Sequence, residues 1–445
     1  MGDHRTEAAC LLETGTAFPR RIGLHLKDNE LVFAGMKPDG LSLYYGDEPI
    51  FHFDLEGRWL HAFVSGVHYY KGLDSMTTAV DRGREGANLV LKRRKLAYVD
   101  ATEFDDVVRS TALHLLEAIE SKHVDSASPP GGVQMLELDE LAVVLDRAAR
   151  WDAAAWFAQR ERYREQFGDP PFLPPGSERS IVLEATIGHP RGVGFGGSTV
   201  PAHRVRSVED FQAHAERVAR IWGRRVLQAK SIYLAGGDVF TRPNTEILGY
   251  LDAIAESFPL LETEGDRDAT SASGRAVSVR CLIDDFSPEV PDPNRLADYR
   301  ERGLDRTALG VISGDRLIRA VFARDWADSS LDSFITAAKA AEIPLDLLVL
   351  TGAGGRERSE AHVRSIVELI ERIKPSQGDL VFLLDLEEVG GESAIARLRE
   401  AALTHSGRAD RIEEQKQMKT ALLGMSKRRG FKVVPYGMEK QMTRF

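Results

Sequence analysis

The sequence predicts an α/β protein with a β-rich region near its N-terminus and a longer C-terminal region of alternating strands and helices. Short β-prone runs around turn signals occupy about residues 20 to 100. A Ser-, Pro- and Gly-rich segment follows at Asp125–Val133 (DSASPPGGV). From Arg179 onward, apolar runs alternate with amphipathic stretches about six times. Repeated strand–helix units imply a parallel sheet with right-handed crossovers, in an open or closed (β/α) barrel or a doubly wound sheet.

Composition excludes several classes of protein. The chain has 445 residues, 43% hydrophobic and 28% charged, which is ordinary for a folded protein with large cores and excludes a wholly disordered chain. No run reaches the roughly 20 apolar residues needed to span a bilayer, and the N-terminal MGDHRTEAACLLETG lacks the apolar stretch of a secretory signal. We therefore expect a cytoplasmic protein without a membrane partner.

The net charge of −10 disfavours nucleic acid as the main partner, although it leaves room for a local basic patch. Cysteine usage is more decisive. Only Cys10 and Cys281 are present, far apart in the chain. Two thiols cannot build a disulfide scaffold or supply the three or four thiolates of a typical zinc or iron–sulfur site.

The predicted β-rich module spans residues 1–124. A Pro-Asp-Gly turn within Glu30–Gly46 predicts a hairpin, Pro49–Lys71 and Asn88–Asp100 predict further short strands, and helical spacing in Glu103–Ser121 predicts a closing helix. The basic run Lys92–Lys95 is typical of a solvated edge strand.

Three histidines of this module, His52, His61 and His68, lie on neighbouring predicted strands. They could bind zinc, but imidazoles are also ordinary on a half-buried sheet face, and we favour the sheet face. A linker and helical connector follow at residues 125–178, where Trp151, Trp156 and Phe157 predict a helix–helix core.

The barrel region with its C-terminal tail spans residues 179–445. Its predicted strands are Ile181–Thr186, Ser231–Ala235, Val277–Ile283, Thr307–Ile312, Leu345–Thr351 and Leu380–Leu386. Its predicted helices are Val208–Trp222, Asn244–Phe258, Asn294–Arg302, Ser330–Ala341 and Ser359–Ile373. Ligands of such folds bind at the C-terminal ends of the strands, so the residues after each strand are the candidates for a site.

Glycine follows the first two strands. Gly188–Gly197 (GHPRGVGFGG) can bring backbone N–H groups close to a ligand, but it is neither a Walker loop nor a dinucleotide fingerprint, and it could be a flexible connection. After the second strand, Gly236, Gly237 and Asp238 could hold an ammonium group through backbone carbonyls and one carboxylate, or could form an ordinary turn.

Three further strand ends carry candidates. The adjacent carboxylates Asp284 and Asp285 could bind a polar substrate or a metal. In the fourth segment, Gly310–Asp315, Ser313 can cap a turn. The fifth strand ends in Gly352–Gly355 (GAGG), a permissive backbone against which a planar ligand could lie.

Several strings in order resemble the radical S-adenosylmethionine (radical SAM) superfamily. They are FLPP at Phe172–Pro175, IVLEATIG at Ile181–Gly188, RVRSVE at Arg204–Glu209, SIYLAGGD from Ser231, LVLTGAGG from Leu348 and SEAHVR at Ser359–Arg364, and the resemblance covers about residues 172–445. It implies a partial (β/α) barrel preceded by the β-rich domain. It also implies that Gly236, Gly237, Asp238, Ser313, Gly352, Gly354 and Gly355 contact S-adenosylmethionine.

The sequence departs from that superfamily at the cluster. The resemblance places a cysteine triad on the loop GHPRGVGFGG, where this chain has His189, Gly194 and Gly197. Glycine offers no ligand atom, and clusters of this kind need thiolates with only occasional imidazole substitution. We therefore expect no four-iron four-sulfur cluster, no other metal, and no radical cleavage of S-adenosylmethionine.

Three functions remain open. The protein could still bind S-adenosylmethionine or a related adenosyl ligand at the barrel mouth without radical chemistry, which is the interpretation that we favour. It could instead be a non-catalytic scaffold whose N-terminal module binds a protein partner. It could also be an enzyme with non-radical chemistry in the old pocket, with His189, Asp238, Asp284 and Asp285 as candidates. Whether it is an enzyme is not decided by the sequence.

Overall fold

The computed structural model describes residues 20–27, 30–85, 88–127, 134–168, 171–258, 278–286 and 291–443. Cys10, most of the Ser-, Pro- and Gly-rich segment 125–133, and residues 169–170 of the predicted connector lie outside these ranges. The chain divides into two compact units. The N-terminal unit comprises Met1–Tyr163 with Trp222–Gln228, and the barrel unit comprises Arg164–Ile221 with Ala229–Phe445.

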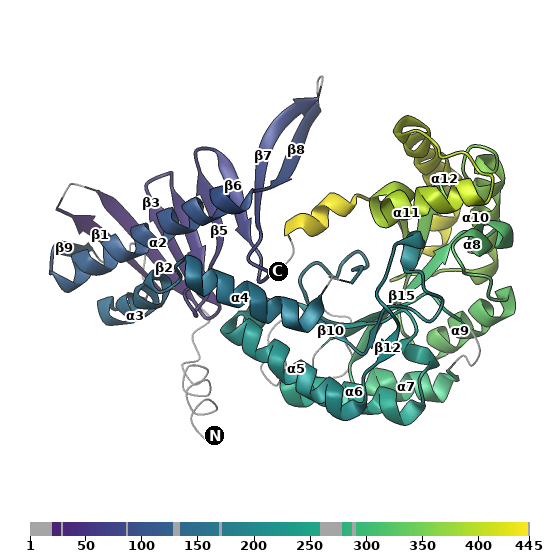
Figure 1. Ribbon diagram of the computed structural model, residues 1–445, viewed down its shortest axis with the longest axis horizontal. Coiled ribbons are helices and arrows are strands. Elements are labelled where there is room, and N and C mark those ends of the chain that lie inside the picture. The colour runs from purple at the N-terminus through teal and green to yellow at the C-terminus, as the bar shows by residue number, and fades with distance from the viewer. Residues whose placement is uncertain are drawn as a thin grey trace. The chain divides into compact units, whose positions relative to one another are not determined.

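The N-terminal unit is built on a nine-stranded antiparallel sheet in the order β8-β7-β6-β5-β4-β3-β2-β1-β9 (Figure 1). Its strands are β1 Arg20–Leu26, β2 Leu31–Lys37, β3 Gly40–Tyr45, β4 Ile50–Phe53, β5 Trp59–Val64, β6 Val67–Lys71, β7 Thr77–Glu85, β8 Asn88–Lys95 and β9 Val124–Ala127. The predicted hairpin at the Pro-Asp-Gly turn is β2–β3. The basic strand β8 lies at one end of the strand order, so the predicted edge strand is confirmed.

Helices cover one face of this sheet. They are α2 Tyr98–Glu120, α3 Leu138–Ala149 and α4 Ala153–Phe167. Alternate residues of β2, namely Val32, Ala34 and Met36, point inward and pack with Val108 and Leu115 of α2 in one core. The apolar residues that recur every second position in the strands and every third or fourth position in the helix thus face the same core.

The three histidines lie on the opposite side of the alternation. His61 Nε2 and His68 Nδ1 are 2.9 Å apart, and the two rings are nearly parallel with centroids 5.2 Å apart, so they lie edge to edge. Ser42 Oγ lies 2.8 Å from His52 Nδ1. Burial, followed by the neighbouring His52 and His68, lowers the pKa of His61 to about 4. The imidazoles bond to one another and to a hydroxyl instead of converging on a metal, as expected for a sheet face.

The barrel unit contains a seven-stranded parallel sheet in the order β10-β13-β14-β15-β16-β17-β18, a partial (β/α) barrel. Its strands are β10 Ser180–Glu184, β13 Ser231–Ala235, β14 Val279–Ile283, β15 Leu304–Ile312, β16 Leu345–Thr351, β17 Leu380–Asp385 and β18 Lys432–Tyr436. The predicted fold class, a partial barrel after a β-rich domain, is confirmed. Six of the seven strands match predicted segments, and β18 lies in the region taken as a tail.

The helices of the barrel unit connect successive strands. They are α5 Val208–Trp222, α6 Asn244–Ser257, α7 Pro293–Glu301, α8 Arg316–Val321, α9 Asp328–Ala340, α10 Ser359–Ile373, α11 Leu386–Glu400 and α12 Arg408–Arg429. A short hairpin joins β11 Thr186–Ile187 to β12 Arg204–Val205, directly after β10. Local chemistry sets several ends: Asp292 caps α7 by accepting from the backbone N–H groups of Asn294 and Arg295, and Gly430, at φ +81°, ends α12.

No helix in the described ranges is long and apolar enough to cross a membrane.

The packing of α2 on its sheet gives a matched test of burial. Val108 is 1% exposed and its neighbour Val107 is 53% exposed. We expect Val108→Ala to lower the free energy of unfolding by about 2 kcal/mol, from lost apolar burial and the cavity left behind. Val107→Ala should change it by less than about 0.5 kcal/mol. Denaturant unfolding of both variants measures the difference, and equal losses would contradict the packing described.

Candidate functional site

The carboxyl end of β13 carries Asp238, which is 2% exposed. Both of its oxygens have partners. Thr186 Oγ1 donates to Oδ1 at 2.6 Å, and His203 Nε2 lies 2.9 Å from Oδ2. The hairpin β11–β12 supplies both groups, because Thr186 is in β11 and His203 precedes β12. Asp238 therefore anchors that hairpin to the end of β13.

A second buried carboxylate lies at the end of β14. Asp284 is 1% exposed, with His189 Nε2 3.1 Å from Oδ1 and Arg324 donating to Oδ2 at 2.6 Å. Burial alone would raise the pKa of Asp284, but the charge of Arg324 and the hydrogen bond from His189 lower it well below its usual range. Asp284 is thus a carboxylate held ionised inside the protein.

The neighbouring Asp285 forms an ion pair with Arg191, and this pair is more exposed than the one at Asp284. Arg191 reaches its two carboxylate oxygens at 3.0 and 3.1 Å and also donates to Asp325 at 2.6 Å. Hydrogen bonding to Asp285, with the charges of both carboxylates, raises the pKa of Arg191 despite partial burial. Asp285 and Asp284 therefore pair with different arginines.

Gly236 and Gly237 are fitted against these groups. A Cβ at Gly236, where φ is +132°, would lie 2.1 Å from Thr186 Oγ1. A Cβ at Gly237 would lie 2.2 Å from Asp284 Oδ1. Both positions require glycine because the polar side chains approach the backbone there.

The glycine-rich loop after β11 packs inward. Phe195 is 3% exposed and belongs to the apolar core of the barrel, with its ring 4.9 Å from that of Phe172. Gly196, at φ +71°, lies against Val389 and Leu350, and a Cβ at Gly197 would lie 3.0 Å from Phe322. The loop is a packed element of the barrel.

The remaining predicted residues lie at the ends of β15 and β16. Ser313 Oγ is 2.8 Å from His362 Nδ1, and His362 Nε2 is 2.9 Å from the carbonyl oxygen of Leu350. The Gly352 N–H donates to Glu414 of α12 at 2.7 Å, and a Cβ on Gly352 would lie 2.5 Å from Arg411 Cδ. Gly354 and Gly355 lie against Arg358, His362, Leu403 and Thr404.

The predicted residues therefore form two groups. Gly236, Gly237, Asp238, His189 and Asp284 come together with Thr186, His203 and Arg324. Ser313 and the Gly352–Gly355 segment bond instead to side chains of α10 and α12.

Solved structures of radical SAM enzymes are similar to this chain. Coproporphyrinogen III oxidase from Escherichia coli aligns over 60% of this chain and 56% of its own, with 11% identity and a TM-score of 0.40. Elp3 of the archaeon Methanocaldococcus infernus aligns over 57% and 56%, with 15% identity and a TM-score of 0.35. HydG, a maturase of [FeFe]-hydrogenase, aligns over 72% and 61%, with 13% identity and a TM-score of 0.34.

These similarities concern the fold alone. This chain spans little more than half the length of those proteins. No protein-family model matches the sequence, and no curated protein matches it. The sequence has the strings that resemble radical SAM proteins but lacks the cysteine triad.

The residues on the loop do not fit an iron–sulfur cluster. His189 already bonds to Asp284, Gly194 and Gly197 have no side chains, and Phe195 between them is buried in the core. Cys281 lies in β14, where burial raises the pKa of its thiol to about 12 despite a hydrogen bond to Thr307 Oγ1. No group of three or more His, Cys, Asp or Glu side chains in the described part of the chain is placed to hold a metal ion.

Sequence reasoning missed the partners that decide the state of this site. Thr186, His203, Arg324 and His362 each bond to a predicted residue. Thr186 and His362 lie within the strings IVLEATIG and SEAHVR but were given no role there, and Arg324 lies in no such string. It also missed Glu184 at the end of β10, where burial raises the carboxyl pKa to about 7 against the lowering effect of Arg206 and Arg204. Their signal was position, since Glu184 and Thr186 lie in the C-terminal half of the first predicted strand, Ile181–Thr186.

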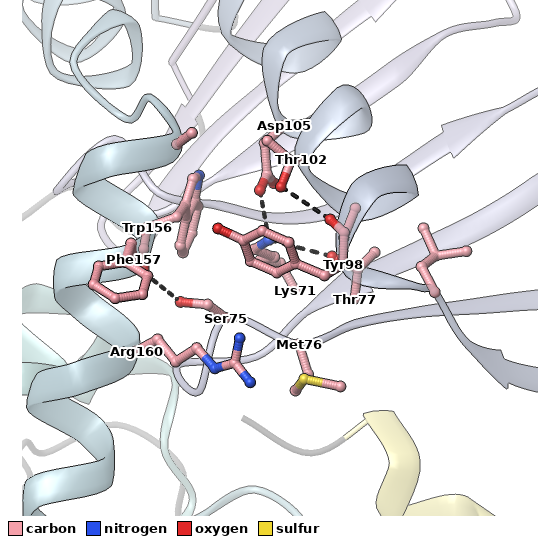
Figure 2. Close-up of a pocket in the computed structure, with 13 residues that line it drawn as sticks. Lys71, Ser75, Met76, Thr77, Tyr98, Thr102, Asp105, Trp156, Phe157 and Arg160 are labelled. Carbon is pink, nitrogen blue, oxygen red and sulfur yellow. Dashed lines mark hydrogen bonds and ion pairs between the residues drawn. The ribbon is translucent and has the colours of Figure 1, made fainter.

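The N-terminal unit has a pocket that the sequence did not indicate (Figure 2). It has a volume of about 110 Å³ and lies among β6, the turn after it, α2 and α4. Lys71 is buried there, with Nζ 2.8 Å from Asp105 Oδ2 and 4.6 Å from the centre of the Trp156 ring. Burial lowers the pKa of Lys71, and the charge of Asp105 partly offsets this. Of the predicted aromatic stripe, Trp156 is buried while Phe157 is 53% exposed and lines this pocket.

We expect Arg324→Met to lower the free energy of unfolding by about 3–5 kcal/mol, because Asp284 would keep a buried charge without its main partner. The double variant Arg324→Met with Asp284→Leu should recover most of that loss, since an apolar pair replaces an ion pair. Denaturant unfolding measures both. Arg364→Met, on an exposed position of α10, is the control. A double variant no more stable than the single one would argue against the ion pair.

The depressed pKa of Asp284 predicts an acid-dependent stability. A carboxylate with a folded pKa below its unfolded value of about 4 contributes stability that is complete above that value and is lost as the pH falls through the folded pKa. The wild-type protein should therefore lose more stability between about pH 5 and pH 3 than the Arg324→Met, Asp284→Leu variant. Parallel pH series of unfolding curves measure this difference, and identical slopes would contradict it.

Proposed function

We propose that this protein is a cluster-free member of the radical-SAM-like proteins that works by binding, without radical chemistry. The observation that carries the proposal is the chain His189–Asp284–Arg324. His189, which lies where the resemblance places the first cluster ligand, is already hydrogen-bonded to Asp284. Asp284 in turn forms a buried ion pair with Arg324.

The neighbouring carboxylate supports the same conclusion. Asp238 has both oxygens engaged by Thr186 and His203, and the Gly352 N–H is engaged by Glu414. A ligand at the barrel mouth would first have to break these contacts, each of which is buried or partly buried. Because these polar groups already bond to other groups of the protein, we assign them a role in stabilising the barrel. We assign ligand binding to the N-terminal unit, which has an open pocket.

Retained binding of S-adenosylmethionine, or of another adenosyl compound, is the second candidate. One observation favours it: the His203 side chain is 27% exposed, so a ligand ammonium group could displace it from Asp238. Gly236 and Gly237 would then offer backbone on the same edge. This candidate needs one exchange of partners at Asp238, whereas the first needs none.

Iron and sulfide analysis after anaerobic cluster reconstitution tests the loss of the cluster. We expect neither element to be retained in stoichiometric amounts, because the chain has two cysteines and one of them, Cys281, is buried as a thiol. Stoichiometric iron and sulfide would overturn the proposal.

Calorimetric titration with S-adenosylmethionine separates the two candidates. The proposal predicts no saturable heat from the wild-type protein. Saturable binding that is weakened by Asp238→Ala, by the ten- to hundredfold expected for a lost charged contact, would favour the second candidate. Asp325→Ala is the control, because Asp325 is an exposed carboxylate that pairs with Arg191 and not with the residues around Asp238 in the described part of the chain.

A further inference from the structure

We propose that the pocket of the N-terminal unit binds a small planar organic anion: one aromatic ring carrying a carboxylate. This inference rests on the proposed function, because it names the class of ligand that a binding protein of this kind would take.

The size and walls of the pocket favour a single ring. Its volume is about 110 Å³, less than the about 150 Å³ of an apolar protein cavity that holds benzene, so nothing larger than a single ring fits inside. Trp156, Tyr98 and Phe157 supply aromatic surface, and Met76, Leu96 and Ala101 supply aliphatic surface. Aromatic side chains favour offset or edge contacts with a ligand ring.

The charges of the pocket favour an anion. Its ionisable lining residues are Lys71, Asp105 and Arg160. Asp105 is fully engaged, because Lys71 Nζ reaches Oδ2 at 2.8 Å and Trp59 Nε1 donates to Oδ1 at 2.8 Å. The lining therefore carries one excess positive charge, and that charge is on Arg160.

Arg160 is the unusual member of this group. Among the residues that the structure describes, its guanidinium has no carboxylate partner, and it lies over the Tyr98 ring, 5.9 Å from its centre. In Figure 2 its side chain extends from α4 toward Ser75 and Met76. A half-buried guanidinium without a carboxylate partner is well suited to bind a carboxylate, to which it can donate two parallel N–H groups.

A second group is also unsatisfied. Trp156 is 3% exposed, and within the described ranges its Nε1–H has no hydrogen-bond partner. A buried indole N–H usually finds an acceptor, and leaving it unpaired costs free energy. This nitrogen is itself buried, so a ligand oxygen reaches it only if the indole ring turns toward the pocket. The O–H of Ser75 already donates to the carbonyl oxygen of Trp156, whereas Thr77 Oγ1 accepts from Lys71 and keeps its own O–H as a donor.

Titration calorimetry with three probes of equal ring size tests the sign of the charge. Benzoate is the anion, benzamide the neutral analogue and benzylammonium the cation. We expect saturable binding of benzoate by the full-length protein, binding of benzamide that is at least tenfold weaker, and no binding of benzylammonium. Equal affinities for benzoate and benzamide, or no saturable heat with benzoate, would overturn the proposal.

Two variants locate the binding. Arg160→Gln should weaken benzoate binding about ten- to hundredfold while leaving benzamide binding unchanged, because only the charged contact is lost. Trp156→Phe should weaken both probes, since the smaller ring removes part of the aromatic wall of the pocket. Arg162→Gln, an exposed arginine on the same helix, is the matched control and should have no effect.

If Arg160→Gln binds benzoate like the wild-type protein, the anion is not bound here and the inference fails. The barrel titration with S-adenosylmethionine uses a different ligand and a different variant, Asp238→Ala. A positive result there would overturn the proposed function without touching the benzoate result, so the two failures can be told apart.

Discussion

The buried carboxylate of Asp284 sets the arrangement of the barrel mouth. A charge that is 1% exposed must be paired, and the pairing draws two loops together. His189 comes from the glycine-rich loop after β11, and Arg324 comes from the segment between α8 and α9. Arg324 also donates to the carbonyl oxygen of Val193, which fixes the glycine-rich loop a second time. Phe195 then lies in the core because its loop is held at both points.

The fold could be read from the sequence wherever a strand or helix buries a regular pattern. β13 and β16 are mostly apolar and buried along their whole length, and their predicted bounds agree with the structure. β18 could not be read, because KVVPY is short, ends the sheet and is only partly buried. The helices α11 and α12 were missed for a related reason: α11 contains Gly390 and Gly391, with Gly391 outside helical geometry, and α12 is mostly polar.

The site was only half predictable. Position after a strand identified His189, Asp238 and Asp284, and the structure does bring them to one end of the sheet. Position could not show that each is already paired, because the pairing depends on contacts between distant segments. Arg324 is 40 residues from Asp284, and His362 is 49 residues from Ser313. A buried acid and a ligand-binding acid look alike in sequence until the neighbouring cation is known.

The distinction between a satisfied and an unsatisfied charge then separates the two candidate sites. Arg324 is 0% exposed and donates to Asp284 and to backbone carbonyls, so removing a partner would leave a buried charge, whereas adding a ligand would displace one. Arg160 is half-buried, lines a cavity and faces an aromatic ring, and no carboxylate of the described residues pairs with it. A ligand carboxylate there would replace water rather than a protein group. Internal pairing thus makes the polar residues of the barrel mouth a structural element, and the missing pair in the N-terminal unit makes its pocket the better place for a ligand.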